Sequence, residues 1–184
     1  MRRVVVLGRG GAVKSTLATR LGAAVAMPVV ELDKRFWAPD LIPLPAQQWA
    51  TLQRPLVSGE RWILDGDLGP YDGPGPCDGL GTYDVLAVRL RAADTVLVLD
   101  FPLWRCAWRV LRQPRPGPAR TSLSGAGLSP VDAEASLLSC PPCHVRLVMS
   151  AIAEHAGHAE LRVLRNPHAV ARLLSEADGM ASPE

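Results

Sequence analysis

The chain contains little lysine and no long apolar segment. Only two of its 20 basic residues are lysines, Lys14 and Lys34, and the others are arginines. The longest apolar stretch, residues 22–30, is much shorter than the roughly 20 residues that a membrane-spanning helix requires. The N-terminus also lacks the longer apolar core of a secretory signal peptide. We therefore expect a soluble, cytoplasmic protein with no membrane partner, in which each of the two lysines merits attention.

A strong charge imbalance is absent as well. The formal net charge is +2 at pH 7, which is too small to favour non-specific binding to nucleic acids. The sequence also contains no specific nucleic-acid-binding motif. The length of 184 residues fits one domain, so we expect residues 1–184 to form a single domain that is a monomer or a weak dimer.

Cysteine is scarce, but two of the four cysteines are closely spaced. Cys140 and Cys143, followed by His144, have the CxxCH spacing of haem attachment and also resemble a redox pair. Haem attachment normally follows export, and a thioredoxin-type pair should open a helix near the N-terminus. A zinc site would need a second pair of Cys or His ligands, which is missing. We favour a plain loop over a redox, haem or zinc site.

Short apolar runs alternate with segments of helical periodicity along most of the chain. The runs predict buried strands at residues 3–7, 28–32, 61–64, 95–99 and 160–164. The periodic segments predict helices at residues 15–25, 46–57, 85–93, 103–112, 145–155 and 166–177. Strands separated by helices indicate an α/β fold with a parallel sheet that helices cover on both faces.

Proline and glycine interrupt this alternation in two places. Residues 69–83 are rich in both and predict an inserted loop. Residues 113–144 lose periodicity almost entirely, with a short helix possible at 131–138, and predict a flexible, lid-like segment.

The first turn, GRGGAVKST at residues 8–16, lies between the first expected strand and the first expected helix. A phosphate-binding loop needs main-chain N–H groups at a helix N-terminus, a lysine that reaches the β- and γ-phosphates, and a hydroxyl for Mg²⁺. Lys14 and Ser15 supply the last two. The alternative is an ordinary turn with a chance Lys-Ser pair. We predict a P-loop whose nucleotide-binding residues are Gly8, Gly10, Gly11, Ala12, Val13, Lys14, Ser15 and Thr16.

Val13 departs from the P-loop pattern G-x-x-x-x-G-K-S, which has glycine at this position. Glycine lets the main chain turn beside the phosphates with no Cβ in the way, whereas a β-branched side chain resists positive φ. The same residue breaks the dinucleotide-binding pattern G-x-G-x-x-G, and Lys14-Ser15 then favours the P-loop. We expect Val13 to weaken nucleotide binding.

Five segments together resemble the adenylate-kinase-like P-loop kinases, specifically the small bacterial group called DNA topology modulation proteins. The resemblance implies a three-layer P-loop NTPase fold with five parallel strands in the order 2-3-1-4-5. It also implies ATP and Mg²⁺ as cofactors and phosphoryl transfer to a nucleotide or other small-molecule acceptor. The segments are RVVVLGRGGAVKSTLATRL, VVELDKRFW, RWILDGDLGPYD, RLRAADTVLVLDFPLWRCAWRVLR and ELRVLRNPHAVARLL.

The resemblance also implies roles for individual residues. Lys14 would hold the phosphates, Arg105 and Arg109 would neutralise the transferring phosphate, and Asp33 would orient the acceptor. Metal-binding, adenine-flanking and further acceptor-site residues would be Ser15 and Asp100 for Mg²⁺, Arg165 beside adenine, and Trp37, Asp65, Gly66 and Asp67 at the acceptor.

Alternatives remain for several of these residues and for the activity itself. Asp33 and Asp100 could cap helices, and the arginines could form a solvated helix face. Because Val13 and the lid-like segment both depart from the family pattern, the alternative function is a catalytically impaired nucleotide-binding protein. A weaker alternative is an interaction module that uses the proline-rich loop.

Overall fold

The computed structural model describes residues 1–9, 11–32, 46–66, 80–112 and 143–181. Within these ranges, five strands form one parallel sheet in the order β2-β3-β1-β4-β5, which confirms the predicted fold class and strand order. The strands are β1 (Arg3–Gly8), β2 (Val29–Glu31), β3 (Trp62–Asp65), β4 (Thr95–Leu99) and β5 (Glu160–Leu164).

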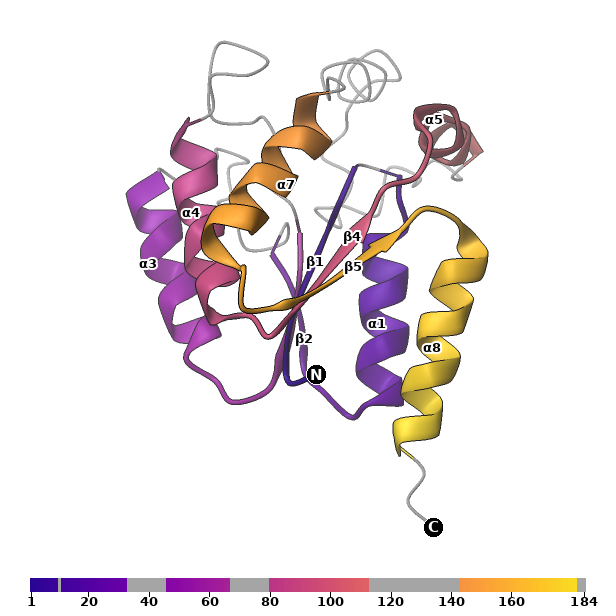
Figure 1. Ribbon diagram of the computed structural model, residues 1–184, viewed down its shortest axis with the longest axis horizontal. Helices are drawn as coiled ribbons and strands as arrows, with labels where there is room; N and C mark the ends of the chain where they lie inside the picture. The colour runs from indigo at the N-terminus through magenta and orange to yellow at the C-terminus, as the bar shows by residue number, and fades with distance from the viewer. Residues whose placement is uncertain (10, 33–45, 67–79, 113–142, 182–184) are drawn as a thin grey trace, which may run out of the picture.

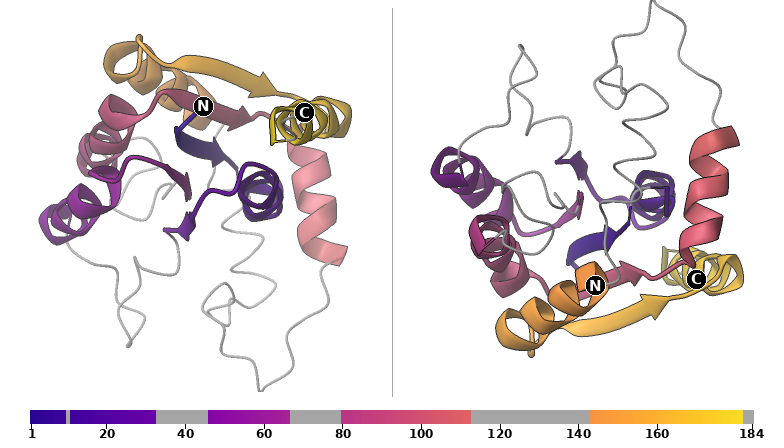
Figure 2. Two further views of the ribbon diagram at one scale, coloured as in Figure 1. Left: turned by 90° about the horizontal axis from the view of Figure 1, so that it is seen from below. Right: turned by 90° about the horizontal axis from the view of Figure 1, so that it is seen from above.

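Helices cover both faces of the sheet, so the structure has three layers (Figure 1). One face carries α1 (Lys14–Ala24) and α8 (Pro167–Ala181). The other carries α3 (Ala46–Val57), α4 (Leu80–Ala92) and α7 (Cys143–His155). The remaining described helix, α5 (Leu103–Arg112), follows β4 and lies beyond the carboxyl end of that strand (Figure 2). No described helix is long and apolar enough to cross a membrane.

Several helix boundaries differ from the predicted ones by one to five residues; α8, for example, ends at Ala181 rather than at residue 177. Helix α4 begins at Leu80 rather than at residue 85, so the last four residues of the expected loop 69–83 are helical. Helix α7 begins at Cys143, so the expected segment 113–144 ends in a helix rather than entirely in loop. Gly81 and Thr82 are poor helix formers, which is why their local sequence indicates a turn. Residues 67–79 and 113–142 lie outside the described ranges.

The core consists of two apolar clusters that the central strand separates. Val5 and Leu7 of β1 face the cluster under α4 and α7, whereas Val4 and Val6 face the cluster under α1 and α8. All four side chains are fully buried, as expected for a parallel sheet covered on both faces.

Helix α1 packs very closely on the sheet at Gly22. A Cβ added to Gly22 would lie 2.4 Å from Cγ2 of Val29 and 2.9 Å from the Met27 oxygen. Only glycine therefore fits this contact, which fixes the helix that begins at the phosphate-binding turn against the sheet.

Asp94 joins the amino ends of β1 and β4. Its Oδ2 accepts hydrogen bonds from the main-chain N–H groups of Arg2 and Arg3 at 2.8 and 3.0 Å, and its Oδ1 accepts one from the Thr95 hydroxyl at 2.7 Å. Partial burial raises the pKa of Asp94, but these hydrogen bonds outweigh it and hold the pKa below its ordinary value of 3.8. The ionised carboxylate thus stabilises the register of the two central strands.

We expect Asp94→Asn to lower the melting temperature at pH 7, because an amide cannot accept the same set of donors. Since the pKa of Asp94 is lower in the folded chain, its contribution is complete above about pH 4 and disappears as the pH falls through the folded-state pKa. The deficit of the variant should therefore shrink toward pH 3 in thermal unfolding followed by circular dichroism. Asp178→Asn, at an exposed position on α8, is the control. A deficit that does not depend on pH would contradict this role of Asp94.

Candidate phosphate-binding site

The predicted P-loop leaves the central strand at a point where only glycine fits. Gly8 ends β1 with φ at +145°, and a Cβ added there would lie 2.6 Å from the main-chain oxygen of Leu99 on β4. Gly11 also has a positive φ, +75°. The loop is closed internally by a hydrogen bond from the Ala12 N–H to the Arg9 oxygen at 3.1 Å. The glycines at 8 and 11 thus serve a tight turn, as the sequence predicted.

Val13 lies in the left-handed region, with φ at 70° and ψ at 21°, and occupies the N-cap position of α1. Its oxygen accepts the first hydrogen bond of the helix, from the Leu17 N–H at 3.0 Å, but its side chain offers no cap. Positive φ is a genuine outlier for a β-branched residue and costs on the order of 1–3 kcal/mol. The sequence pattern, which has glycine here, anticipated this backbone conformation. The Val13 side chain packs against the cluster under α1 and α8.

Lys14 folds back over the loop. Its Nζ donates to the main-chain oxygens of Gly8 at 2.6 Å and Arg9 at 3.2 Å. An ammonium has three donors, so one remains for another acceptor. The two bonds hold the positive charge of Lys14 next to the turn at residues 8–9, close to the N-terminus of α1. Ser15 and Thr16, in the first turn of α1, are exposed. This end of the helix therefore combines a fixed cation, accessible hydroxyl groups and the positive end of the helix dipole, an arrangement suited to an anion.

Asp100 and Arg165 meet where β4 and β5 end. Their side chains form an ion pair, with 3.6 Å between Nε of Arg165 and Oδ2 of Asp100. The strands stay paired to this point, since the Asp100 N–H donates to the Leu164 oxygen at 3.0 Å. Asn166 then caps α8 by accepting the Ala169 N–H at 2.9 Å. Asp100 makes no helix-capping hydrogen bond among those of the described residues, so the geometry gives that alternative no support.

Cys106 marks the point where the loop, β4 and α5 converge. The thiol is fully buried, and burial raises its pKa, while the positive charges of Arg9, Lys14 and Arg109 act to lower it. The Asp100 carboxylate acts on the same thiol. The cations that act on this thiol come from two segments, Arg9 and Lys14 from the loop and Arg109 from α5 itself.

Helix α5 divides its exposed surface between aromatic and basic side chains. Trp104 and Trp108 are 69% and 53% exposed, so packing in the core does not explain them. Arg112 lies over the Trp108 ring, 4.1 Å from its centre, which is a cation–π contact. Arg105 is half-buried and Arg109 exposed. The two predicted catalytic arginines thus lie on the helix that approaches the loop.

A buried arginine that the sequence did not predict as a site residue contacts the turn that follows β3. Arg89 of α4 is 1% exposed, and its Nη1 donates to the Gly66 oxygen at 2.5 Å. Asp65 is 2% exposed, and Gly66 has φ at +138°. Arg89 lies on the same face of α4 as the apolar residues Leu86 and Leu90. This position in the sequence could have indicated that Arg89 is buried. A fully buried arginine is rare unless its charge is satisfied, so it fixes the turn after β3.

Several predicted site residues are not described. Gly10, Asp33, Trp37 and Asp67 lie outside the described ranges. The described residues therefore include most of the predicted phosphate-binding residues. Of the predicted acceptor site they include only Asp65 and Gly66, at the end of β3.

The described residues contain no cluster of three or more His, Cys, Asp or Glu side chains that could hold a metal ion alone. Mg²⁺ commonly keeps several waters and uses one or two protein oxygens together with substrate phosphates. The exposed hydroxyl of Ser15 and the carboxylate of Asp100 are compatible with this mode of binding.

The same fold occurs in solved structures of small-molecule kinases. Shikimate kinase from Acinetobacter baumannii in complex with shikimate is 14% identical, with a TM-score of 0.56, over 96% of this chain and 90% of that one. Shikimate kinase from Bacteroides thetaiotaomicron is 14% identical, with a TM-score of 0.53, over 97% of each chain. A sugar kinase from Janibacter sp. is 18% identical, with a TM-score of 0.51, over 100% and 99%.

These similarities establish that the chain has the fold of P-loop kinases. No protein-family model matches the sequence, and a comparison with curated proteins found no match. At such low identity the structural similarity concerns the fold alone.

We expect Val13→Gly to leave the chain about 1–3 kcal/mol more stable than Val25→Gly does, because both variants lose a half-buried side chain but only Val13→Gly relieves strain. Glycine removes the strain of a left-handed valine, about 1–3 kcal/mol, and gives back about 0.5–1 kcal/mol in chain entropy. Val25, at the other end of α1, has φ at −101° and is also half-buried, so Val25→Gly should destabilise the chain by about 1 kcal/mol. Urea unfolding measures both. A similar loss of stability in the two variants would contradict a left-handed Val13.

Proposed function

We propose that this chain is an ATP-dependent, Mg²⁺-using phosphotransferase of the adenylate-kinase-like P-loop kinases, in the DNA topology modulation protein group. It acts in the cytoplasm on a hydroxyl or phosphate of a nucleotide or other small molecule. The observation that carries this proposal is the position of Lys14. This residue begins α1, and its Nζ donates to the main-chain oxygen of Gly8 at the start of the loop.

The loop provides the main binding energy for the phosphates of ATP. The N–H groups of the first turn of α1 have no acceptor within the helix and can donate to phosphate oxygens. Lys14 exchanges its hydrogen bonds with the oxygens of Gly8 and Arg9 for stronger, charge-assisted bonds to phosphate. Because Gly8, Gly11 and Val13 already have the positive φ angles of the turn, these residues need little rearrangement on binding.

The charges around Cys106 explain how transfer would be promoted. Phosphoryl transfer requires little covalent chemistry from the protein and depends on positioning and on charge stabilisation. Arg109, with Arg105 one turn before it, would bring positive charge from α5 to the transferring phosphate; its charge and that of Lys14 already act on the same thiol, Cys106. Ser15 and Asp100 would hold Mg²⁺, which would supply positive charge to the phosphates when bound.

Adenine and the acceptor would lie on opposite sides of the loop. Arg165, exposed at the end of β5 and paired with Asp100, would cover the base. The acceptor side would begin at Asp65 and Gly66, held by Arg89. Asp33, Trp37 and Asp67 would complete it.

A second candidate is a nucleotide-binding protein with impaired transfer. The observation that favours it is the strained N-cap at Val13, where the P-loop pattern has glycine. In this case the chain would bind MgATP, but the phosphates would not reach the geometry that transfer requires.

Lys14→Ala should lower phosphoryl transfer at least about 100-fold, since one preorganised charge at the transferring group is worth about that much. ADP release from MgATP with a panel of nucleotides and hydroxyl compounds measures the rate. Arg20→Ala, which removes an exposed cation from the same helix, should leave the rate unchanged. Equal rates in Lys14→Ala and the wild type would contradict the kinase proposal. Binding of MgATP by a wild type that shows no turnover would support the impaired alternative.

A further inference from the structure

Strand β5 forms one edge of the sheet (Figure 2). Toward β4, the Glu160 N–H donates to the Asp94 oxygen at 2.9 Å, and the Leu164 oxygen accepts from Asp100 at 3.0 Å. Main-chain groups of successive residues in a strand point to opposite sides. The N–H and C=O groups of Leu161 and Val163 therefore point outward, away from β4, and can pair with another strand.

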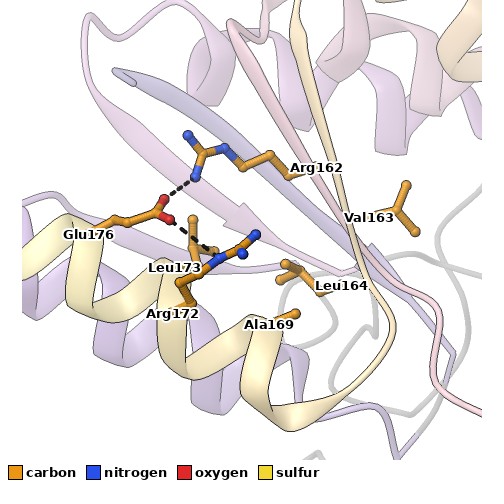
Figure 3. A pocket seen from close by; sticks show the side chains of 7 residues that line it. All are labelled: Arg162, Val163, Leu164, Ala169, Arg172, Leu173 and Glu176. Carbon is orange, nitrogen blue, oxygen red and sulfur yellow. Dashed lines mark hydrogen bonds and ion pairs between the residues drawn. The ribbon is translucent and has the colours of Figure 1, made fainter.

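The described residues leave a hollow beside this strand. A pocket of about 410 Å³ lies between β5 and α8 (Figure 3). Leu164 packs in the cluster under α8, whereas Val163 packs against the opposite cluster, yet both line the pocket. Because residues of both faces contribute, the pocket reaches the strand edge. Leu161 is 39% exposed beside it.

The two charged residues of β5, Glu160 and Arg162, would lie opposite each other if the strand paired with an antiparallel copy of itself. Glu160 and Arg162 lie on the same face of the strand, and Arg162 bonds to Glu160 at 2.7 Å and to Glu176 at 2.6 Å. If a second copy of β5 runs antiparallel with the two-fold axis at Leu161, each Glu160 lies opposite Arg162 of the other copy. Opposite charges at paired positions stabilise a sheet, and like charges destabilise it.

The adjacent register is unfavourable for the same reason. An axis at Arg162 would place the two Arg162 side chains directly opposite each other. The axis at Leu161 instead pairs the two half-exposed leucines and joins their main chains by two hydrogen bonds. On each side, the Val163 N–H can donate to the oxygen of Ala159, whose own N–H is already bonded to the Ala156 oxygen at 2.9 Å.

We infer that the chain forms a symmetric homodimer in which β5 pairs antiparallel with β5 of a second copy, with the two-fold axis at Leu161. The two sheets become one continuous sheet. The contact rests on few main-chain hydrogen bonds, two pairs of opposite charges and one apolar pair, so the dimer is weak and depends on concentration. This inference is independent of the proposed function.

Sedimentation equilibrium of the full chain, from about 1 µM to about 1 mM, tests the dimer. The wild type should shift from monomer mass toward dimer mass. Glu160→Arg and Arg162→Glu should each raise the dissociation constant at least tenfold, because each places like charges opposite each other. An equimolar mixture of the two variants should dimerise again, since the heterodimer restores two opposite pairs. Glu60→Arg, a reversal at an exposed residue just before β3, which β1 and β4 separate from β5, should leave association unchanged.

Cysteine cross-linking tests the register. The axis at Leu161 places residue 161 opposite itself, at a Cα separation of about 5.5 Å that a disulfide can span. Leu161→Cys should therefore form a covalent dimer on mild oxidation, at a yield at least tenfold above that of Val163→Cys. Thermal unfolding of each variant confirms that it is folded.

Three outcomes would overturn the inference: a wild type that stays monomeric at the highest concentration, a mixture no more dimeric than either charge variant alone, or cross-linking through residue 163 and not 161.

Discussion

The close approach of β1 to β4 at Gly8 is the constraint on which the rest of the site depends. A Cβ at this position would lie only 2.6 Å from the Leu99 oxygen, so no side chain fits, and the chain leaves the sheet with a positive φ. It then passes through two further positive-φ residues, Gly11 and Val13, before α1 begins at Lys14. Gly22 fixes that helix against the sheet at its other end. The direction of the helix N-terminus, and thus of its dipole, follows from these contacts.

This geometry explains why charges from distant segments gather in one place. In a parallel sheet, the carboxyl ends of the strands meet at one edge, and residues that follow them become neighbours. Lys14 follows β1, Asp100 follows β4, and Arg165 follows β5. Helix α5 adds Arg109 and the buried thiol of Cys106, whose pKa responds to the charges of Lys14, Arg109 and Asp100. Main-chain oxygens hold the Lys14 ammonium and Asp100 pairs with Arg165, so these two cations have positions fixed by the chain itself.

Local pattern predicted the fold and the positive-φ turn before α1 well, because both depend on short-range signals. The apolar runs of β1 and β4 are buried on both faces, and the left-handed backbone at Val13 follows from the position at which P-loops have glycine. The early start of α4 was not predictable, since Gly81 and Thr82 disfavour a helix locally. Arg89 was missed because a charged residue on a helix normally faces solvent, and only the tertiary structure shows that it holds Gly66. Likewise, the exposure of Trp104 and Trp108 could not be read from residue type.

Calorimetric titration of MgATP into the wild type and Val13→Gly tests the central claim, that the loop is already formed for phosphate. Sequence alone suggested that Val13 weakens binding. Because its left-handed conformation is present in the folded chain and its side chain packs toward the core, the strain is a cost of folding rather than of binding. The account predicts that both proteins bind MgATP with dissociation constants within about threefold, or about 0.6 kcal/mol. A wild type that does not bind, or tightening of tenfold or more in Val13→Gly, would contradict it.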